Sequence, residues 1–411
     1  MSNNRNKNVL LMIFLDAFSQ TYLSKKITPF LYSLANEGIS TTVDTVFAFR
    51  GVETTMFTGV WPNVHGSWTE FKLAEDFTRN KKVRIMQGMI KTLDTIPSDG
   101  FRAKSRFFVE RYLFKRMYST LNIMPSQAIP YFKTTQLKET VEEGSLGGIP
   151  TIFDVFRKKG IPYHCFEPWI RGDKEVFNRA QKMINKNEQN GFWYLKFSHL
   201  DHLGHKFGPD PTLFKGELSK IDNYVMDIVN LARKGKDNVS ILIVADHGMS
   251  RVHSKVDIAD ELSRLHSRMY KDYLVFVDST ITRFWFFNDR AMHEVADMLN
   301  SLKCGHVISA EEKEYLHIPL DVQYGELLFA LDEGFVNHPS FFNQKSEVKG
   351  MHGYAYSKTP ESHPILIIKG IRKTENLIKN GISHIDISRI IMSSFFPGAN
   401  YKHNGLSGYL N

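Results

Sequence analysis

Short apolar runs, separated by segments with helical spacing, constrain most strongly how this chain can fold. The apolar runs cover residues 9–15, 192–197, 239–245 and 365–369. Each has the length of a buried strand. The segments with apolar residues at helical spacing are 29–37, 151–159 and 215–233. Because strands that alternate with helices form mostly parallel sheets, we predict an α/β fold with such a sheet sandwiched between helices.

The first apolar run could be mistaken for a signal peptide, because residues 1–7 before it are polar and basic. Asp16 interrupts the run at once, and no small-residue cleavage site follows. No segment of the chain is apolar for long enough to span a bilayer. Two cysteines, Cys165 and Cys304, fit structural thiols in a reducing compartment. We therefore expect a buried first strand that ends at Asp16, and a cytoplasmic protein.

One segment differs from the rest of the chain in charge. Between Phe77 and Thr135, twelve Lys and Arg residues are opposed by only three Asp and Glu residues, although the whole chain has a net charge of +8. Aromatic residues are interleaved with these cations. We interpret residues 75–144 as a basic, aromatic-rich helical insert. The α/β core would then consist of residues 1–74 and 145–411, with a smaller subregion around 270–345.

The basic insert fits three roles, and the sequence leaves them open. It could be a solvated surface, a lid over an anionic substrate, or a patch that rests on anionic lipid. The chain contains no recognised nucleic-acid-binding motif. We expect a cytoplasmic location in each case, and the lipid-binding role would add peripheral contact with the inner membrane surface.

Asp and His residues gather just after three of the predicted strands, and a further His lies in a glycine-flanked loop. These residues are Asp16, Asp201, His205, Asp246, His247 and His352. Open α/β sheets place their sites at the carboxyl ends of strands, so we expect these side chains to lie near one another. Carboxylate and imidazole groups are good ligands for zinc and manganese. Three Asp and three His residues suffice for two divalent metal ions, of either element.

Two such ions roughly 3.5–4 Å apart can hold both the attacking and the leaving oxygen of a phosphoryl displacement. The spacing of Asp201 and His205 would let both side chains face one metal from a single turn. The adjacent residues Asp246 and His247 would serve the other metal.

Several motifs, and their order along the chain, resemble those of the alkaline phosphatase superfamily, on the branch of type I phosphodiesterases and nucleotide pyrophosphatases. The most specific match is the segment 201–205, Asp-His-Leu-Gly-His. The other matches are the segments 28–38, 58–66, 151–154, 246–249 and 352–354. The resemblance covers most of the chain except the basic insert.

The resemblance implies an alkaline phosphatase-like fold and two metal sites. Asp201, His205 and His352 would hold one metal, and Asp16, Asp246 and His247 would hold the other. In this family a Thr or Ser nucleophile is transiently phosphorylated.

The chain departs from the family at the nucleophile. The family's hydroxyl lies about nine residues before the threonine at position 58, and here that position is Phe49. Thr54 becomes a candidate nucleophile if the helix starts later than in the family. An interior helix threonine is the simpler interpretation of Thr54.

A second departure concerns phosphate binding. Our alignment places Glu70 where the family has a phosphate-binding Asn. Arg50 could instead clamp a phosphate or phosphonate bidentately. Glu53 could equally neutralise Arg50 as an ion pair.

These observations predict a two-metal phosphoesterase, with phosphodiester hydrolysis of the nucleotide pyrophosphatase kind as the favoured reaction. Its substrate would be an anionic small molecule or a lipid-linked phosphorylated molecule. Water activated at the metals could replace the missing hydroxyl at Phe49. The alternative is a metal-binding pseudoenzyme, or binding module, for a phosphorylated or lipid-linked ligand. A phosphate mutase or sulfatase is disfavoured, because mutases also use a hydroxyl nucleophile and no sulfatase signature is present. The sequence does not indicate an oligomeric state.

Overall fold

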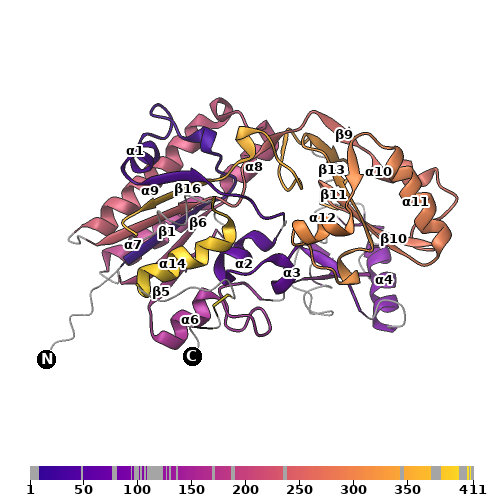
Figure 1. Cartoon of the computed structure of the whole chain (residues 1–411), viewed down its shortest axis with the longest axis horizontal. Helices are drawn as coiled ribbons and strands as arrows, with labels where there is room; N and C mark the ends of the chain where they lie inside the picture. Colours follow the sequence, from indigo (N-terminus) through magenta and orange to yellow (C-terminus); the bar gives the residue numbers. More distant parts are fainter. Residues whose placement is uncertain are drawn as a thin grey trace.

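The protein is described by a computed structural model. The residues it describes are 9–47, 50–75, 81–93, 95–96, 101, 104–105, 108, 124–125, 127–128, 131–135, 138–168, 172–186, 190–234, 238–342, 347–371, 381–397, 405–406 and 408. Figure 1 shows two lobes, each built around its own sheet. The first lobe carries the predicted α/β core, and the second lies between β9 (Ser254–Val256) and β14 (Phe335–Asn337) in the sequence.

A six-stranded sheet forms the first lobe, in the order β2-β16-β7-β1-β6-β5. Its strands are β1 (Val9–Leu15), β2 (Ile39–Thr42), β5 (Tyr163–Phe166), β6 (Gly191–Phe197), β7 (Val239–Val244) and β16 (Ile365–Lys369). Strands β5, β6, β1 and β7 pair in parallel, and β16 pairs antiparallel with β7 and β2. The predicted α/β fold with a mostly parallel sheet is confirmed, as are the four strands expected from apolar runs.

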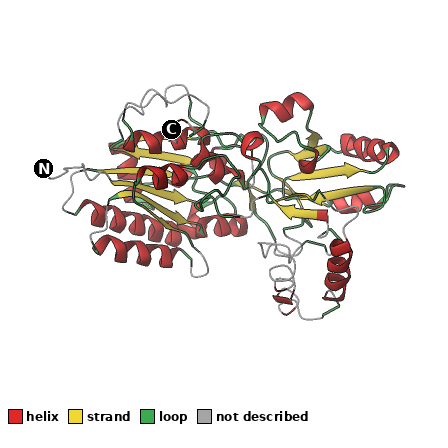
Figure 2. Cartoon of the chain, turned by 90° about the horizontal axis from the view of Figure 1, so that it is seen from below, coloured by secondary structure: helices red, strands yellow, loops and turns green. Residues whose placement is uncertain are grey.

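Helices cover both faces of this sheet (Figures 1 and 2). One face carries α2 (Gly51–Thr58), α6 (Ile152–Lys159) and α14 (Ile387–Phe395). The other carries α1 (Pro29–Glu37), α7 (Asp173–Asn185), α8 (His199–Phe207) and α9 (Lys215–Arg233). The helices expected at 29–37, 151–159 and 215–233 are therefore present as α1, α6 and α9.

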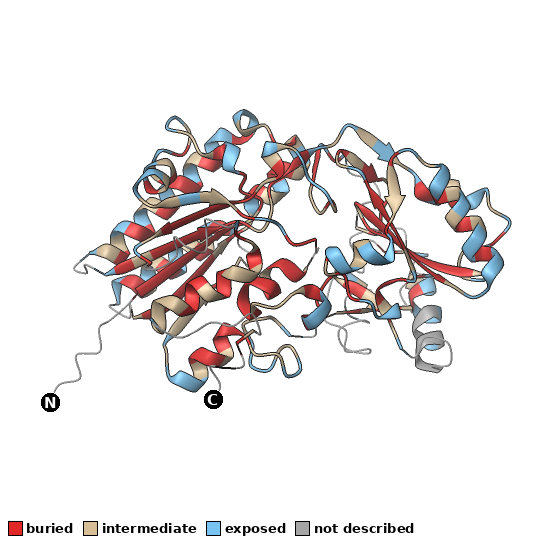
Figure 3. Cartoon of the chain, in the orientation of Figure 1, coloured by how far each residue is buried: buried red, intermediate tan, exposed pale blue. Residues whose placement is uncertain are grey.

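The central strand β1 explains why the first apolar run has no polar interruption. Leu10 and Met12 pack into the hydrophobic cluster of one face, whereas Leu11 and Ile13 pack into the cluster of the other face. Successive side chains point to opposite faces, so a strand buried on both sides is apolar at every position. Figure 3 shows the central strands as buried along their length.

The second lobe contains a four-stranded antiparallel sheet, in the order β10-β11-β13-β12. Its strands are β10 (Tyr273–Val277), β11 (Ile281–Phe286), β12 (Gly305–Val307) and β13 (Leu327–Leu331). The helices that accompany it are α10 (Ile258–Ser263), α11 (Asp289–Ser301) and α12 (Ala310–Tyr315). Two pairs of short strands join the lobes: β9 with β14, and β8 (Ser250–Arg251) with β15 (Gly350–Met351).

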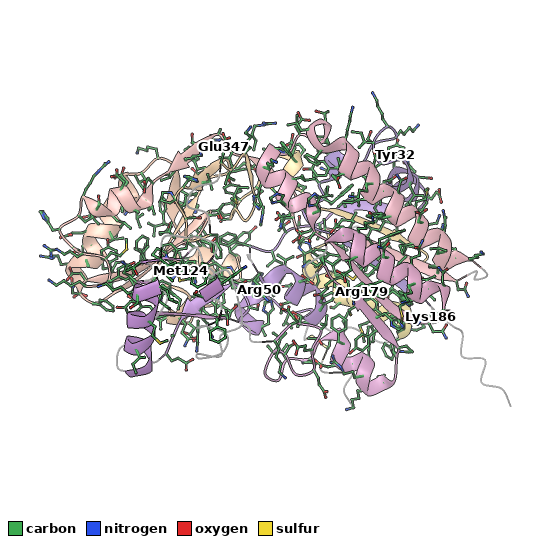
Figure 4. All side chains as sticks on the ribbon, turned by 180° about the vertical axis from the view of Figure 1, so that it is seen from behind. Tyr32, Arg50, Met124, Arg179, Lys186 and Glu347 are labelled. Carbon is green, nitrogen blue, oxygen red and sulfur yellow. The ribbon has the colours of Figure 1, made fainter. Side chains whose placement is uncertain are left out.

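The basic segment begins and ends beside the second lobe. Its base is formed by β3 (Phe71–Leu73) and β4 (Phe132–Thr134), which pair antiparallel, and α4 (Lys81–Leu93) follows β3 in the sequence. Phe71, Phe132 and Met124 belong to the hydrophobic cluster of the second lobe (Met124 in Figure 4). Many of the segment's cations lie outside the described residues, so its helical character over 75–144 and its boundaries stay predictions. No described helix is both long and apolar enough to cross a bilayer.

Candidate metal centre

The structure brings the six predicted metal ligands together in two groups of three. One group consists of Asp201, His205 and His352, and the other of Asp16, Asp246 and His247. Within each group, one potential ligand atom per residue lies within 4.8 Å of the others. The two groups adjoin, because the rings of His247 and His352 stack with centroids 3.5 Å apart and planes 7° apart.

Two neighbouring parallel strands position the second group. Asp16 follows β1 and Asp246 follows β7 by two residues, so both lie at the carboxyl edge of the sheet. The backbone N–H groups of Ala17 and His247 donate to Oδ1 of Asp246, at 3.1 and 2.9 Å. This fixes the carboxylate and leaves its Oδ2 3.3 Å from Nε2 of His247. Oδ1 of Asp16 lies 3.7 Å from the same nitrogen.

Helix α8 positions the first group. Asp201 and His205 are four residues apart on this helix and therefore share a face, with Oδ1 and Nε2 3.3 Å apart. The carboxylate of Asp173 accepts the N–H groups of Ser198 and His199 at 2.9 and 3.3 Å, which anchors the start of the helix. Nδ1 of His205 lies 2.9 Å from the carbonyl oxygen of a residue in β15, which leaves Nε2 directed at the group.

Two glycines allow these elements to approach closely. A Cβ atom at Gly350 would lie 2.4 Å from the carbonyl oxygen of Gly204, so α8 could not pack against β15 with a side chain there. A Cβ atom at Gly248 would lie 2.1 Å from the carbonyl oxygen of Glu361. Gly350 and Gly248 thus permit backbone contact beside the ligands.

The chemistry of the two groups fits divalent cations. Oδ1 of Asp201 is buried and accepts no well-formed hydrogen bond within the described part of the chain, although Nε2 of His205 and of His352 lie 3.3 and 3.5 Å away. Burial, with the charges of Asp246 and Asp201 close by, holds the pKa of Asp16 well above its ordinary value. A divalent cation at each group would supply the missing countercharge, and carboxylate and imidazole ligands suit zinc or manganese.

A cavity of about 370 Å³ opens beside both groups and is strongly acidic. Among the residues that the structure describes, seven carboxylates line it, against two cationic side chains, Arg50 and Lys196. The carboxylates are Asp16, Glu53, Glu70, Glu139, Glu167, Asp201 and Asp246. A negatively charged phosphate is repelled by such a wall unless bound cations neutralise it. The charge of the cavity is therefore a further reason to expect metal ions here.

Arg50 is held by carboxylates of the cavity wall. Its Nη1 lies 2.8 Å from Oε2 of Glu70, and its Nη2 lies 3.7 Å from Oε2 of Glu139. Figure 4 shows Arg50 between the two lobes. Glu53 pairs with Lys196 of β6, at 2.5 Å, and the positive charge of Arg50 also acts to lower the pKa of Glu53, so the hypothesis that Glu53 neutralises Arg50 stays a prediction. The role of Arg50 as a phosphate clamp stays a prediction.

The ion pair between Glu53 and Lys196 was not predicted from the sequence. Tyr194 also donates to Glu53, at 2.6 Å, and the ammonium group of Lys196 lies over the ring of Phe14. Burial opposes the charge of Lys196, but Glu53 and Asp16 outweigh it and raise the lysine's pKa. The signal was present, since Lys196 is the one charged residue in the apolar run 192–197. A charge inside a buried strand indicates a partner or a site.

The candidate nucleophile Thr54 lies in the wall of the same cavity. Its side chain is almost fully buried in α2, and its Oγ1 is 3.3 Å from Oγ1 of Thr140. Helix α2 begins at Gly51, so Thr54 lies in its first turn. Phe49, the position of the family's hydroxyl, lies outside the described residues. The role of Thr54 stays a prediction.

A family model of type I phosphodiesterase/nucleotide pyrophosphatase matches residues 10–355. The chain belongs to this family. The resemblance to the corresponding branch of the alkaline phosphatase superfamily is thereby confirmed. The fold of this phosphodiesterase family member is also that of human ectonucleotide pyrophosphatase/phosphodiesterase 5, with a TM-score of 0.68 and 97% of each chain covered at 15% identity. The inactive murine counterpart in complex with AMP matches with a TM-score of 0.66, also at 15% identity and over 97% of each chain.

The family member also shares a shorter stretch of sequence with the human catalytic subunit of GPI ethanolamine phosphate transferase 2. The two are 30% identical over 115 residues, which make up 26% of this chain and 12% of that protein. The match thus spans only a small part of the transferase.

Proposed function

We propose that this family member is a two-metal phosphoesterase that favours phosphodiesters. The observation that carries the proposal is the pair of three-residue groups, joined at the stacked rings of His247 and His352. The two groups lie at the carboxyl edge of the sheet and open onto one cavity.

In this proposal each residue of the site has a defined task. Asp201, His205 and His352 would hold one divalent cation, and Asp16, Asp246 and His247 would hold the other. When bound, such cations polarise the phosphoryl oxygens and lower the pKa of water. Zinc and manganese both suit the ligand set.

The chain's own side chains would orient the substrate around this centre. Lys196 keeps a positive charge beside Asp16 and offsets part of the acidic wall. Arg50, which pairs with Glu70, would contact a phosphoryl oxygen beside that partner or in exchange for it. We therefore propose that Arg50 is a specificity element and that Lys196 is the constant cation of the cavity.

For the nucleophile we favour water over Thr54. The hydroxyl of Thr54 is engaged with Thr140, and its side chain is buried in the helix. A water route needs no covalent intermediate, which agrees with a phenylalanine at position 49. The Thr54 route remains the competing version of the same proposal.

For the substrate we propose an anionic phosphorylated molecule, either small or lipid-linked. The relatives named for pyrophosphatase/phosphodiesterase and for ethanolamine phosphate transfer support a phosphorylated substrate, and the latter supports a lipid link. We further propose a cytoplasmic location, with the basic segment in contact with anionic lipid at the inner membrane surface. Among the described residues of that segment, Glu139 and Thr140 line the cavity.

The second candidate is a binding module without turnover. Phe49 at the nucleophile position favours it. The retention of two complete ligand groups supports the enzyme instead, because a binding module has little need of both.

One experiment separates the two candidates. We expect purified protein to contain two equivalents of zinc or manganese by elemental mass spectrometry, and to hydrolyse bis(4-nitrophenyl) phosphate. A chelator should abolish turnover, and the same metal should restore it. Metal without turnover of any phosphodiester, phosphomonoester or sulfate ester would favour the binding module. Protein that binds no metal would refute the proposal.

A further inference from the structure

Glu167 directly follows β5 and lies in the wall of the acidic cavity. Strand β5 pairs in parallel with β6, and β6 with β1, so Glu167 is at the same edge of the sheet as Asp16 and Asp201. The proposed reaction assigns no role to this residue. Sequence analysis did not single it out either.

The carboxylate of Glu167 is not committed to a partner. The neighbouring Glu53 pairs with Lys196, and Glu70 pairs with Arg50. No hydrogen bond or ion pair involves Glu167 within the part of the chain that the structure describes. A carboxyl group that is largely buried and unpaired is expensive to ionise, and such groups concentrate at functional sites.

Burial, assisted by the negative charge of Glu53, raises the pKa of Glu167 to about 7. The other charged groups that act on it are Lys196 of β6 and Arg179 of α7, which favour its ionisation, and Glu139, which opposes it. At neutral pH Glu167 therefore exists in both protonation states. This is the condition for efficient proton transfer.

A third metal site does not explain Glu167. The two groups already described are the ones in which at least three potential ligands converge, among the residues whose placement is described, and Glu167 belongs to neither. A carboxyl group that belongs to neither ligand group can act by binding and releasing a proton.

We propose that Glu167 is the general acid of this site and protonates the oxygen of the leaving alcohol. The proposal rests on the phosphodiesterase function above. As the bond between phosphorus and the leaving oxygen breaks, its electron pair stays on that oxygen, which takes the proton of the Glu167 carboxyl group. The oxygen of the attacking water forms the new bond to phosphorus and releases a proton to solvent, and solvent returns a proton to Glu167 for the next turnover.

The proposal predicts that the effect of losing Glu167 depends on the basicity of the leaving group. 4-Nitrophenolate leaves readily without being protonated. Phenolate and alkoxides depend increasingly on protonation as their basicity rises. General acid catalysis contributes about 10²- to 10⁴-fold in rate. Loss of Glu167 should therefore slow poor leaving groups strongly and good ones little.

The test compares wild type with Glu167→Gln on aryl methyl phosphates whose leaving phenols range from 4-nitrophenol to phenol. We expect kcat/KM to fall roughly 100-fold for phenyl methyl phosphate and less than about fivefold for the 4-nitrophenyl ester. The dependence of log kcat/KM on leaving-group pKa should steepen accordingly. Metal content should stay at two equivalents. Glu217→Gln, a change in an exposed α9 carboxylate that lines neither cavity, should behave as wild type.

The pH profile gives a second readout. With phenyl methyl phosphate, the activity of wild type should fall as the pH rises through about 7, because the acid form of Glu167 is the active one. Glu167→Gln should lack this alkaline limb, and Glu167→Asp should recover part of it. An equal loss for good and poor leaving groups would overturn the proposal. If wild type itself hydrolyses no ester in the series, the proposed function fails before this inference is reached.

Discussion

Two cavities meet at the stacked rings of His247 and His352, and they differ in chemistry. The smaller, of about 370 Å³, is lined by seven carboxylates. The larger, of about 600 Å³, has one acidic and one basic residue in its lining, Asp44 and Lys358, besides histidines. Its aromatic lining residues are Phe47, Trp61, Tyr315, Tyr354 and Tyr356. The comparison indicates that the smaller cavity suits the charged part of a ligand and the larger cavity its uncharged part.

The larger cavity also draws its wall from both lobes. Trp61 precedes α3 (Pro62–His65), and His317 follows α12 of the second lobe. Their rings stack with centroids 3.9 Å apart and planes 15° apart. Flat, partly apolar surfaces of this kind suit a ring or chain attached to the phosphate. A diester would thus span the two cavities, with its phosphate at the histidine pair.

The largest effect should come from the acidic side, through Asp246→Ala. This change removes a ligand whose Oδ2 faces His247, and one metal equivalent should be lost. Activity on bis(4-nitrophenyl) phosphate should fall on the order of 10³-fold, equivalent to about 4 kcal/mol of transition-state stabilisation. Elemental analysis and steady-state kinetics measure both. The exposed Asp297→Ala on α11 is the control, and retention of both metal content and activity in Asp246→Ala would contradict the site assignment.

A second large effect should come from the partly buried pair of Lys196 and Glu53. Lys196→Met leaves Glu53 without its cation in a partly buried place, and should lower the free energy of unfolding by about 3 kcal/mol. Adding Glu53→Gln should recover most of that loss, because neither charge then remains unpaired. Guanidinium unfolding of the single and double variants measures this. The matched exposed change Lys220→Met, which breaks a pair with Glu217, should alter stability by less than about 1 kcal/mol.

Glu167 should lower the free energy of unfolding of the protein as the pH rises. Its folded pKa of about 7 exceeds its ordinary value of 4.5, so its contribution is fully favourable below pH 4.5 and is lost as the pH rises through 7. Glu167→Gln cannot ionise. The free energy of unfolding of Glu167→Gln, relative to that of wild type, should therefore rise by on the order of 2 to 3 kcal/mol between pH 4 and pH 8. Denaturant unfolding of metal-free protein at both pH values measures this, and a pH-independent difference would refute the raised pKa.

On the larger cavity, Trp61→Ala should have a smaller and different effect. We expect KM to rise about tenfold for diesters that carry an aromatic ring, corresponding to about 1.4 kcal/mol, because one face of the stack is lost. The value of kcat and the metal content should be unchanged. Phe287→Ala, at an exposed aromatic that lines neither cavity, is the control. A fall in kcat alone would mean that Trp61 supports the reacting centre rather than the bound ring.

The acidic side was largely predictable from sequence, whereas the aromatic side was not. Asp16, Asp201 and Asp246 each come after a strand that its apolar run predicts, and the geometry of parallel strands brings such positions to one edge. His352 was singled out by its glycine-flanked loop, but its place in a ligand group came from the family resemblance, since no strand of the main sheet directly precedes it. Trp61 and His317 lie 256 positions apart in different lobes, and no local pattern connects them.

The ion pairs of the site could not be predicted from the sequence either. The pairing of Arg50 with Glu70 depends on how the chain folds around α2, and Lys196 pairs with Glu53 from β6. Glu167 carried no motif, and its significance comes from burial without a partner. Such features arise from packing in three dimensions rather than from spacing along the chain.

The smallest effect should be that of Thr54→Val, which decides between the two routes of attack. The exchange keeps the shape of the side chain and removes its hydroxyl, so the contact with Thr140 is lost. If water attacks, kcat/KM on bis(4-nitrophenyl) phosphate should change by less than about threefold, since a neutral hydrogen bond contributes about 1 kcal/mol or less to a buried site. If Thr54 is the nucleophile, the change should abolish turnover, and wild type should show a phosphorylated Thr54 by mass spectrometry after rapid quenching. An unaffected Thr54→Val variant would leave the acidic cavity with its metal ligands and Glu167 as the complete catalytic set.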